Sequence, residues 1–248
     1  MFGLVLSVVI SAPGWPRVQS TFFSASEFDK TLPKIFAGFL VNMGIFLVAQ
    51  ALVLVFALVL AAMRGLKDPV FFPFRLFAIL YIDLFRGLPS ILIIYVLGLG
   101  IPALRIPGVT SDVYVWGVVA LVLVWTAYVA EVYRSGIDSV HPSQDAAARS
   151  LGLSGYQSFR FVVLPQAVRR VIPPLLNDAI GLMKDTALVS FLGPVEAFRR
   201  SQIFASADFN YTPYLVSAML FLMLTIPLAR FVDRLVTRDR KRYLAGAR

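Results

Sequence analysis

The run FAGFLVNMGIFLVAQALVLVFALVLAAM, residues 36–63, carries no charged side chain and decides the class of fold. An α-helix rises about 1.5 Å per residue, so about 20 apolar residues cross the hydrocarbon core of a bilayer. This run is long enough to cross with room for tilt. Because lipid-exposed backbone must satisfy its own hydrogen bonds, the run predicts a transmembrane helix.

Four more segments of suitable length and apolarity follow, so we expect an all-α integral membrane protein with five transmembrane helices. The composition agrees, because 58% of the residues are hydrophobic and only 15% are charged, far fewer than a soluble domain of this size carries. The other predicted spans are residues 76–99, 113–132, 171–192 and 214–231.

Absences in the sequence narrow the function. The chain has no cysteine and one histidine, His141, so we expect neither a disulfide framework nor a multi-histidine metal centre within it. No segment has the glycine-rich pattern ending in Gly-Lys-Ser/Thr that cradles phosphates, so this chain is not expected to hydrolyse ATP. The sequence therefore predicts a non-catalytic chain without its own cofactor or metal.

The basic residues predict how the chain sits in the membrane. Fifteen of the 23 Lys and Arg residues lie in the loops after the first and third spans or in the C-terminal tail, against six on the opposite side. Because short loops rich in Lys and Arg stay in the cytoplasm, we expect the N-terminus outside and the C-terminus inside. This topology accounts for the net charge of +9 without a nucleic-acid partner.

The chain divides into three predicted regions: an extracytoplasmic segment at 1–35, a transmembrane domain at 36–235 with a cytoplasmic loop at 134–170, and a basic cytoplasmic tail at 236–248. The first 12 residues are apolar but too short to span a bilayer. They lack a cationic start and a small-residue cleavage site. We therefore expect them to lie uncleaved at the outer surface.

The cytoplasmic loop contains an unusual polar stretch, PSQDAAARSLGLSGYQSFRFVVLPQA, residues 142–167. Ser143 is a suitable N-cap, and Asp145 suits the positive end of a helix dipole. Gly152 is placed to end that helix in a left-handed conformation. Ser154 and Gln157 form a capping-box pattern that starts a second helix, expected to continue to Pro165. The stretch predicts a pair of short helices outside the membrane.

The spacing of this stretch resembles the cytoplasmic loop of permease subunits of binding-protein-dependent ABC importers. That pattern reads Glu-Ala-Ala, three residues, Gly, nine residues, Ile, one residue, Leu-Pro. The chain keeps every spacing but has Ala146 in place of the glutamate, beside Asp145. The matching residues are Ala146, Ala147, Ala148, Gly152, Val162, Leu164 and Pro165.

The resemblance covers most of the chain and points to the polar-amino-acid branch of these permeases. It is carried by FRGLPSILIIY (residues 85–95), AYVAEVYRSGI (127–137) and the long piece from Leu164 to Gly193. The resemblance implies that the loop docks on a separate ATPase subunit and that two permease chains pair around a pathway. It also implies two ATPase subunits that bind ATP and Mg²⁺, and a substrate-binding protein that delivers the solute from outside. The expected location is the cell membrane.

The span at 171–192 carries ionisable groups, which are costly in a bilayer and usually face a partner or a wet cavity. At about 100° per residue, its polar residues and one glycine fall within an arc of about 120°. They are Asn177, Asp178, Gly181, Lys184 and Asp185. Two roles stay open for these candidates: contact with a polar solute, or neutralisation of one charge by another, such as Lys184 by Asp178 or Asp185.

Other charges near the spans have local explanations. Asp83 and Arg86 are three residues apart and are expected to pair, although Arg86 is also a candidate for the pathway. Gly87 and Pro89 are expected to break the helix there. Glu131 is expected to pair with Arg134 or to face the pathway. Aromatic residues of the third span, including Trp125 and Tyr128, are expected to be interfacial or to pack.

The sequence thus predicts the pathway-forming subunit of an ATP-driven amino-acid importer, in which Pro165, Pro173 and Pro174 interrupt helix between the loop and the fourth span. An ion-coupled secondary transporter that uses Asp178 and Asp185 is the main alternative, and a channel subunit is another. A third alternative keeps the ATP-driven importer but changes its solute to an opine or another small polar organic ion. Transport without an ATPase subunit would favour the secondary transporter or the channel.

Overall fold

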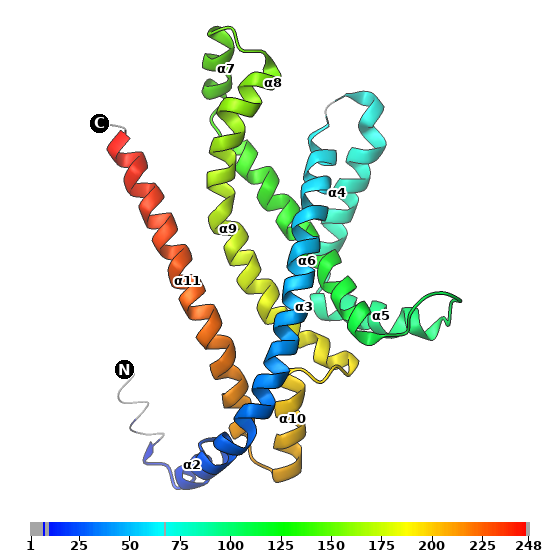
Figure 1. The fold of residues 1–248 in the computed structure, drawn as a ribbon, viewed down its shortest axis with the longest axis vertical. Coiled ribbons are helices and arrows are strands. Elements are labelled where there is room, and N and C mark those ends of the chain that lie inside the picture. Colours follow the sequence, from blue (N-terminus) through cyan, green and yellow to red (C-terminus); the bar gives the residue numbers. More distant parts are fainter. Residues whose placement is uncertain (1–6, 8–9, 67, 247–248) are drawn as a thin grey trace.

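The structure is a computed structural model that describes residues 7, 10–66 and 68–246, and all the secondary structure in them is helical (Figure 1). The predicted surface segment at residues 1–12 falls largely outside the described residues, as does the loop residue Lys67. The elements are α2 (Trp15–Phe22), α3 (Ala25–Gly65), η1 (Pro69–Phe71), α4 (Phe72–Gly87), α5 (Ser90–Ala103), α6 (Val113–Asp138), α7 (Pro142–Ser150), α8 (Gly155–Ser158), η2 (Phe159–Val163), α9 (Leu164–Asp185), η3 (Thr186–Leu192), α10 (Ala197–Asp208) and α11 (Thr212–Gly246).

The first predicted span, residues 36–63, lies within α3, which begins earlier than the apolar run. The helix begins at Ala25, where the side chain of Ser24 accepts a hydrogen bond from the backbone N–H of Glu27 over 3.4 Å. Pro33 lies inside the helix without ending it. The apolar run gave no sign of this earlier start, because the extra turns are polar and owe their boundary to an N-cap.

Among the described residues, three helical stretches are long and apolar enough to cross a membrane: residues 15–65, 113–138 and 212–238. The second predicted span is not one straight helix, since α4 and α5 meet at an angle of 102°. The bend falls at Pro89, which lacks a backbone N–H and holds Leu88 in an extended conformation. Counted as one span, the bent pair gives up to four crossings.

The fourth predicted span corresponds to α9 and η3, which do not pass the same test of length and apolarity. The α-helix ends at Asp185 and the chain continues as a 3-10 helix to Leu192. Gly193 then turns the chain with a φ of 115°, a left-handed conformation that favours glycine. The count of five spans therefore remains a prediction.

Helix α6 packs against α3, α4, α5 and α9, and most of its middle turns are buried. Two of its glycines allow neighbours to cross closely: a Cβ at Gly117 would lie 2.4 Å from Val189, and one at Gly136 would lie 2.0 Å from Val171. Small residues at such crossings are typical of packed membrane helices.

The two ends of the molecule carry different elements (Figure 1). Helices α7 and α8 project at one end of the long axis, and α2 and α10 lie at the other. Helix α10 was not predicted from the sequence. It packs on α3 and α11, and residues on both sides of it bear on the site described below.

Candidate functional site

The polar stretch folds as two short helices, as predicted, but its N-cap differs from the prediction. Nδ1 of His141 accepts a hydrogen bond from the backbone N–H of Ser143 over 3.2 Å, so His141 and not Ser143 is the N-cap of α7. The reason is Pro142, which is well suited to the first position of a helix. The N-cap therefore lies two residues closer to the N-terminus than predicted.

Asp145 joins the two helices of the pair. Its Oδ1 accepts a hydrogen bond from the hydroxyl of Ser158 over 2.5 Å, and its Oδ2 lies 3.0 Å from Nε of Arg149. The hydrogen bond from Ser158 and the charge of Arg149 hold the pKa of the Asp145 carboxyl below its ordinary value. Asp145 therefore has a defined structural contact, beside the position where the family motif has glutamate.

The turn between the two helices follows the predicted signals. Gly152 has a φ of 88°, the left-handed value expected of a residue that ends a helix. The N–H of Leu153 reaches back to the carbonyl of Ala148 over 3.2 Å. Ser154 and Gln157 form the predicted capping box, in which each side chain accepts from the other's backbone N–H.

The sequence predicted that the second helix would end at Pro165, but it does not end there. The chain continues from α8 through the π-helical turn η2 into α9, with Pro165 in the first turn of that helix. Pro165 closely follows this π-helical turn, where the regular hydrogen-bond ladder of an α-helix is already interrupted. Pro173 and Pro174 lie inside α9 and do not interrupt it. The predicted breaks in this segment were therefore wrong.

The helix pair leaves large apolar side chains exposed. Leu151 is 82% exposed, Tyr156 74% and Phe161 67%. Ala146 and Ala147 are also exposed, whereas Ala148 is buried against the rest of the pair. These side chains are thus accessible to a partner outside the predicted membrane spans.

Glu131 lies at the centre of a charged cluster near the end of α6. One carboxylate oxygen accepts from Nη1 of Arg64 over 2.7 Å, and the other accepts from Arg134. Arg134 also bonds to Asp138, at 2.5 Å. The predicted pair between Glu131 and Arg134 is present, and Arg64 adds a link from α6 to α3.

The polar residues of the fourth predicted span do not neutralise one another. Among the ion pairs formed by the described residues, none joins Lys184 to Asp178 or Asp185. Lys184 and Asn177 are exposed, and Asp178 and Asp185 are partly buried. One carboxylate oxygen of Asp178 is buried and has no hydrogen-bond partner in the described structure.

Asp185 faces α6, where Trp125 contacts it. The indole N–H of Trp125 donates to Oδ2 of Asp185 over 3.2 Å. Gly181 makes room for this ring, since a Cβ there would lie 2.2 Å from Cη2 of Trp125. Tyr128 lies beside Trp125 with ring centroids 5.5 Å apart, and the guanidinium of Arg86 lies 5.6 Å from the ring centroid of Tyr128.

These contacts form a seam that joins α4, α6 and α9. Arg86 uses the face of Tyr128 as a cation–π partner. It forms no ion pair with Asp83 in the described residues, so the predicted pair of these two residues is not found. Trp125 and Tyr128 are thus part of the candidate site, although from the sequence they were expected to be interfacial or to pack. Their aromatic character alone carried no signal of this role.

Lys184 points to a different neighbourhood from Asp185. It lines a cavity of about 270 Å³ between α9, α10 and α11. The cavity combines the charge of Lys184 with aromatic walls and the hydroxyl-bearing side chain of Ser217. Its other lining residues are Ala187, Phe198, Tyr214, Ala218 and Phe221.

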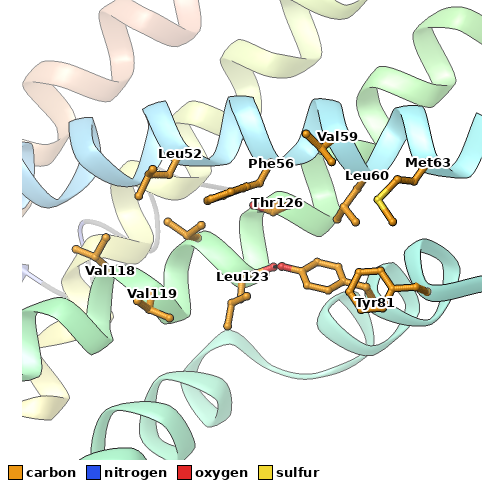
Figure 2. Close-up of a pocket in the computed structure, with 12 residues that line it drawn as sticks. Leu52, Phe56, Val59, Leu60, Met63, Tyr81, Val118, Val119, Leu123 and Thr126 are labelled. Atoms are coloured by element: carbon orange, nitrogen blue, oxygen red, sulfur yellow. Dashed lines mark hydrogen bonds between the residues drawn. The ribbon is translucent and has the colours of Figure 1, made fainter. Parts of the chain in front are cut away.

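A larger cavity lies between α3, α4 and α6 and has a volume of about 410 Å³ (Figure 2). Its walls are almost entirely apolar. Tyr81 closes one side, and its hydroxyl donates to the carbonyl of Leu123 over 2.9 Å. Among the described residues that line it there is no Lys, Arg, Asp or Glu, so this cavity does not suit a charged solute. That favours the seam and the Lys184 cavity as the polar sites.

A bundle of apolar helices with a sharp bend between α4 and α5, and with a capped helix pair projecting at one end, is the architecture of a membrane protein. The chain belongs to the family of inner membrane components of binding-protein-dependent transport systems, whose model matches residues 69–241. The sequence resemblance to permease subunits of ABC importers is thereby confirmed, and with it the location in a membrane.

Individual relatives agree with this family. The putative glutamine transport system permease protein GlnP of Rickettsia conorii is 32% identical over 213 residues, which are 84% of this chain and 95% of the relative. The arginine transport system permease protein ArtQ of Bacillus subtilis is 31% identical and covers 87% of this chain and 97% of its own length. A crystal structure described as an amino acid ABC transporter with histidines matches with a TM-score of 0.78 at 29% identity, over 86% of this chain and 97% of that one.

Proposed function

We propose that this chain forms the translocation pathway of an ATP-driven amino-acid importer. Its membership of the binding-protein-dependent permease family carries the proposal, and the printed functions of its relatives, glutamine and arginine transport, supply the solute class. Two ATPase subunits bind ATP and Mg²⁺, a second permease chain completes the pathway, and an extracytoplasmic binding protein delivers the amino acid.

In this proposal the transmembrane domain spans residues 36–235 with five crossings, one of them the bent pair α4–α5. The N-terminal segment 1–35 lies outside, and the loop 134–170 and the tail 236–248 lie in the cytoplasm. The excess of Lys and Arg on the loop and tail side supports this orientation.

The helix pair α7–α8 is the docking element for the ATPase. The exposed side chains of Leu151 and Tyr156 and the small residues Ala146 and Ala147 give a partner a surface that it can approach closely. The remaining proposed residues of this coupling loop hold its shape: Ser143, Asp145, Ala148, Gly152, Leu164 and Pro165.

The solute follows the polar side of α9. An amino-acid zwitterion carries one charge of each sign, and the candidate site presents the Lys184 ammonium and the Asp185 carboxylate on successive residues that face different neighbours. Asn177, Asp178, Arg86 and Glu131 extend the proposed pathway toward the end of the bundle that bears α7. Each of these assignments is open to single substitution.

Reconstitution tests the proposal directly. Liposomes that contain the permease, its ATPase and its binding protein are expected to accumulate labelled amino acid only when ATP is supplied on the ATPase side. Liposomes with the permease alone and an ion gradient are the control, and ion-driven accumulation there would favour a secondary transporter instead.

The proposed orientation is tested with Leu151→Cys, which gives the chain a single cysteine. This cysteine should react with an impermeant thiol reagent only from the cytoplasmic side.

A further inference from the structure

Glu196 is a fully buried carboxylate that directly precedes α10, the helix at the end of the molecule opposite to α7 and α8 (Figure 1). It caps α10, because its two oxygens accept from the backbone N–H groups of Phe198 over 2.9 Å and Arg199 over 2.7 Å. It also accepts from Nδ2 of Asn42 over 2.9 Å. A glutamate is rarely buried completely unless its charge is satisfied, and here three N–H donors do this.

Asn42 extends this capped carboxylate to two other elements. Its Nδ2 also donates to Oγ1 of Thr186 over 3.0 Å, and its Oδ1 accepts from the backbone N–H of Ala197 over 3.1 Å. The Thr186 hydroxyl in turn donates to the carbonyl of Met183 over 2.7 Å. One side chain of α3 therefore binds the first turn of α10 and the first residue of η3 together.

The backbone of α3 reinforces the link one turn away from Asn42. A Cβ at Gly38 would lie 2.7 Å from the backbone nitrogen of Ala197, a distance that real contacts do not reach. The start of α10 is thus pressed against the bare backbone of α3, and side-chain hydrogen bonds fix its position along that helix.

This buried cluster ends directly beside the candidate pathway. Thr186 follows Lys184 and Asp185 in the chain and is the point at which α9 becomes a 3-10 helix. Phe198 donates its backbone N–H to Glu196, and its side chain lines the cavity that holds Lys184. The groups that set the end of α9 and one wall of the cavity therefore meet at Glu196.

We propose that Glu196 is a positioning residue for transport: through Asn42, Thr186 and the first turn of α10 it fixes where Lys184 and Asp185 stand. The inference rests on the proposed function, since it takes these two residues to line the pathway. The carboxylate is needed because it accepts from donors on both oxygens. A glutamine would turn an NH₂ group toward at least one of these N–H donors and lose that link at almost unchanged volume.

A thiol reporter tests the position of η3 without transport. Ala187→Cys places the chain's single cysteine beside Lys184 in the cavity. In the complete transporter, Glu196→Gln is expected to raise the labelling rate of this cysteine about tenfold, because losing a hydrogen bond to a charged group raises the population of locally open states. The solute concentration for half-maximal uptake is expected to rise by a similar factor.

Ser201→Ala is the matched control. The Ser201 hydroxyl is buried on α10 and donates to the carbonyls of Ala197 and Pro213, with no link to α3 or η3 among the described contacts. A merely structural role for Glu196 would give the same labelling rate and the same half-maximal concentration in Glu196→Gln as in Ser201→Ala, and that result would overturn the proposal.

If Glu196→Gln does not assemble, Thr186 supplies a second pair of variants. Thr186→Val removes only the hydroxyl that Asn42 binds, whereas Thr186→Ser keeps it. Faster labelling in the valine variant alone supports the proposal, and equal rates contradict it. A wild-type complex that labels as expected but takes up no amino acid would contradict the proposed function and leave the positioning role to be judged from labelling.

Discussion

The indole N–H of Trp125 in α6 donates to the carboxylate of Asp185 at the end of α9, over 3.2 Å. The two residues are 60 positions apart in the chain, and the contact depends on Gly181, which leaves space for the ring. It ties a charged group of the proposed pathway to the most enclosed helix of the bundle. Its strength should therefore influence both the orientation of Asp185 and its interaction with a solute.

Replacing Asp185 with asparagine should change transport more than folding. The amide keeps the shape and can still accept from Trp125, but it loses the negative charge. We expect the half-maximal uptake concentration or the maximal rate to change about tenfold, the size of one hydrogen bond to a charged group. Trp125→Phe is the companion variant: it removes the donor and also the part of the indole that packs on Gly181. Wild-type uptake kinetics for Asp185→Asn would assign the residue to structure.

Two glycines of α3 should respond to alanine in opposite directions. At Gly38 the new methyl group would collide with the backbone of α10, and a cost of about 1–3 kcal/mol in the free energy of unfolding is expected. At Gly44 none of the described residues lies within 4 Å of the new methyl group, and alanine is the better helix former, by about 1 kcal/mol. Thermal unfolding in the same detergent measures both. A Gly38→Ala variant as stable as Gly44→Ala would show that the crossing is looser than described.

Gly152→Val should separate ATP hydrolysis from uptake. A β-branched residue at a φ of 88° is strained by about 1–3 kcal/mol, so the turn between α7 and α8 should change shape while the membrane helices stay folded. We expect ATP hydrolysis to continue and solute accumulation to fall. Gly65→Val is the control. It adds the same side chain at a position where φ is not positive and where no described residue lies within 4 Å of the new Cβ. Coupled uptake at the wild-type level in Gly152→Val would argue against docking through this turn.

The helix pair should loosen in acid through Asp145. Its pKa is held below the ordinary 3.8 in the folded loop, so its contribution is present above the unfolded pKa and is lost as the pH falls through the folded one. Hydrogen exchange of α7 and α8, corrected for intrinsic rates, should be equally slow at pH 6 and pH 8 and faster below about pH 4. Asp145→Asn should remove this difference, and a pH dependence that survives the substitution would point to another group.

Local signals in the sequence predicted the helix pair well. Gly152 and the capping box at Ser154 act on backbone groups within a few residues, so no distant contact is needed to place them. The same holds for the break before Pro89. The N-cap at His141 was not predicted because Ser143 is the commoner capping residue, whereas Pro142 takes the first helical position and makes His141 the cap.

Features set by distant contacts were not predictable in this way. The angle of 102° between α4 and α5 depends on packing of α5 against α6 and η3, which no local pattern encodes. Glu196 was missed because glutamate is an uncommon N-cap and its partner Asn42 lies 154 residues away. A lone asparagine inside the apolar run at 36–63 was the one available signal, since a polar side chain in such a run is expected to have a partner.

The uninterrupted helical path from Gly155 to Asp185 has a mechanical consequence. At a rise of about 1.5 Å per residue it is a rod roughly 45 Å long that its prolines do not interrupt. A rod pushed at one end tilts as a whole. A small sideways shift of the projecting turn would thus swing the far tip, where Lys184 sits, without any part of the rod having to unfold.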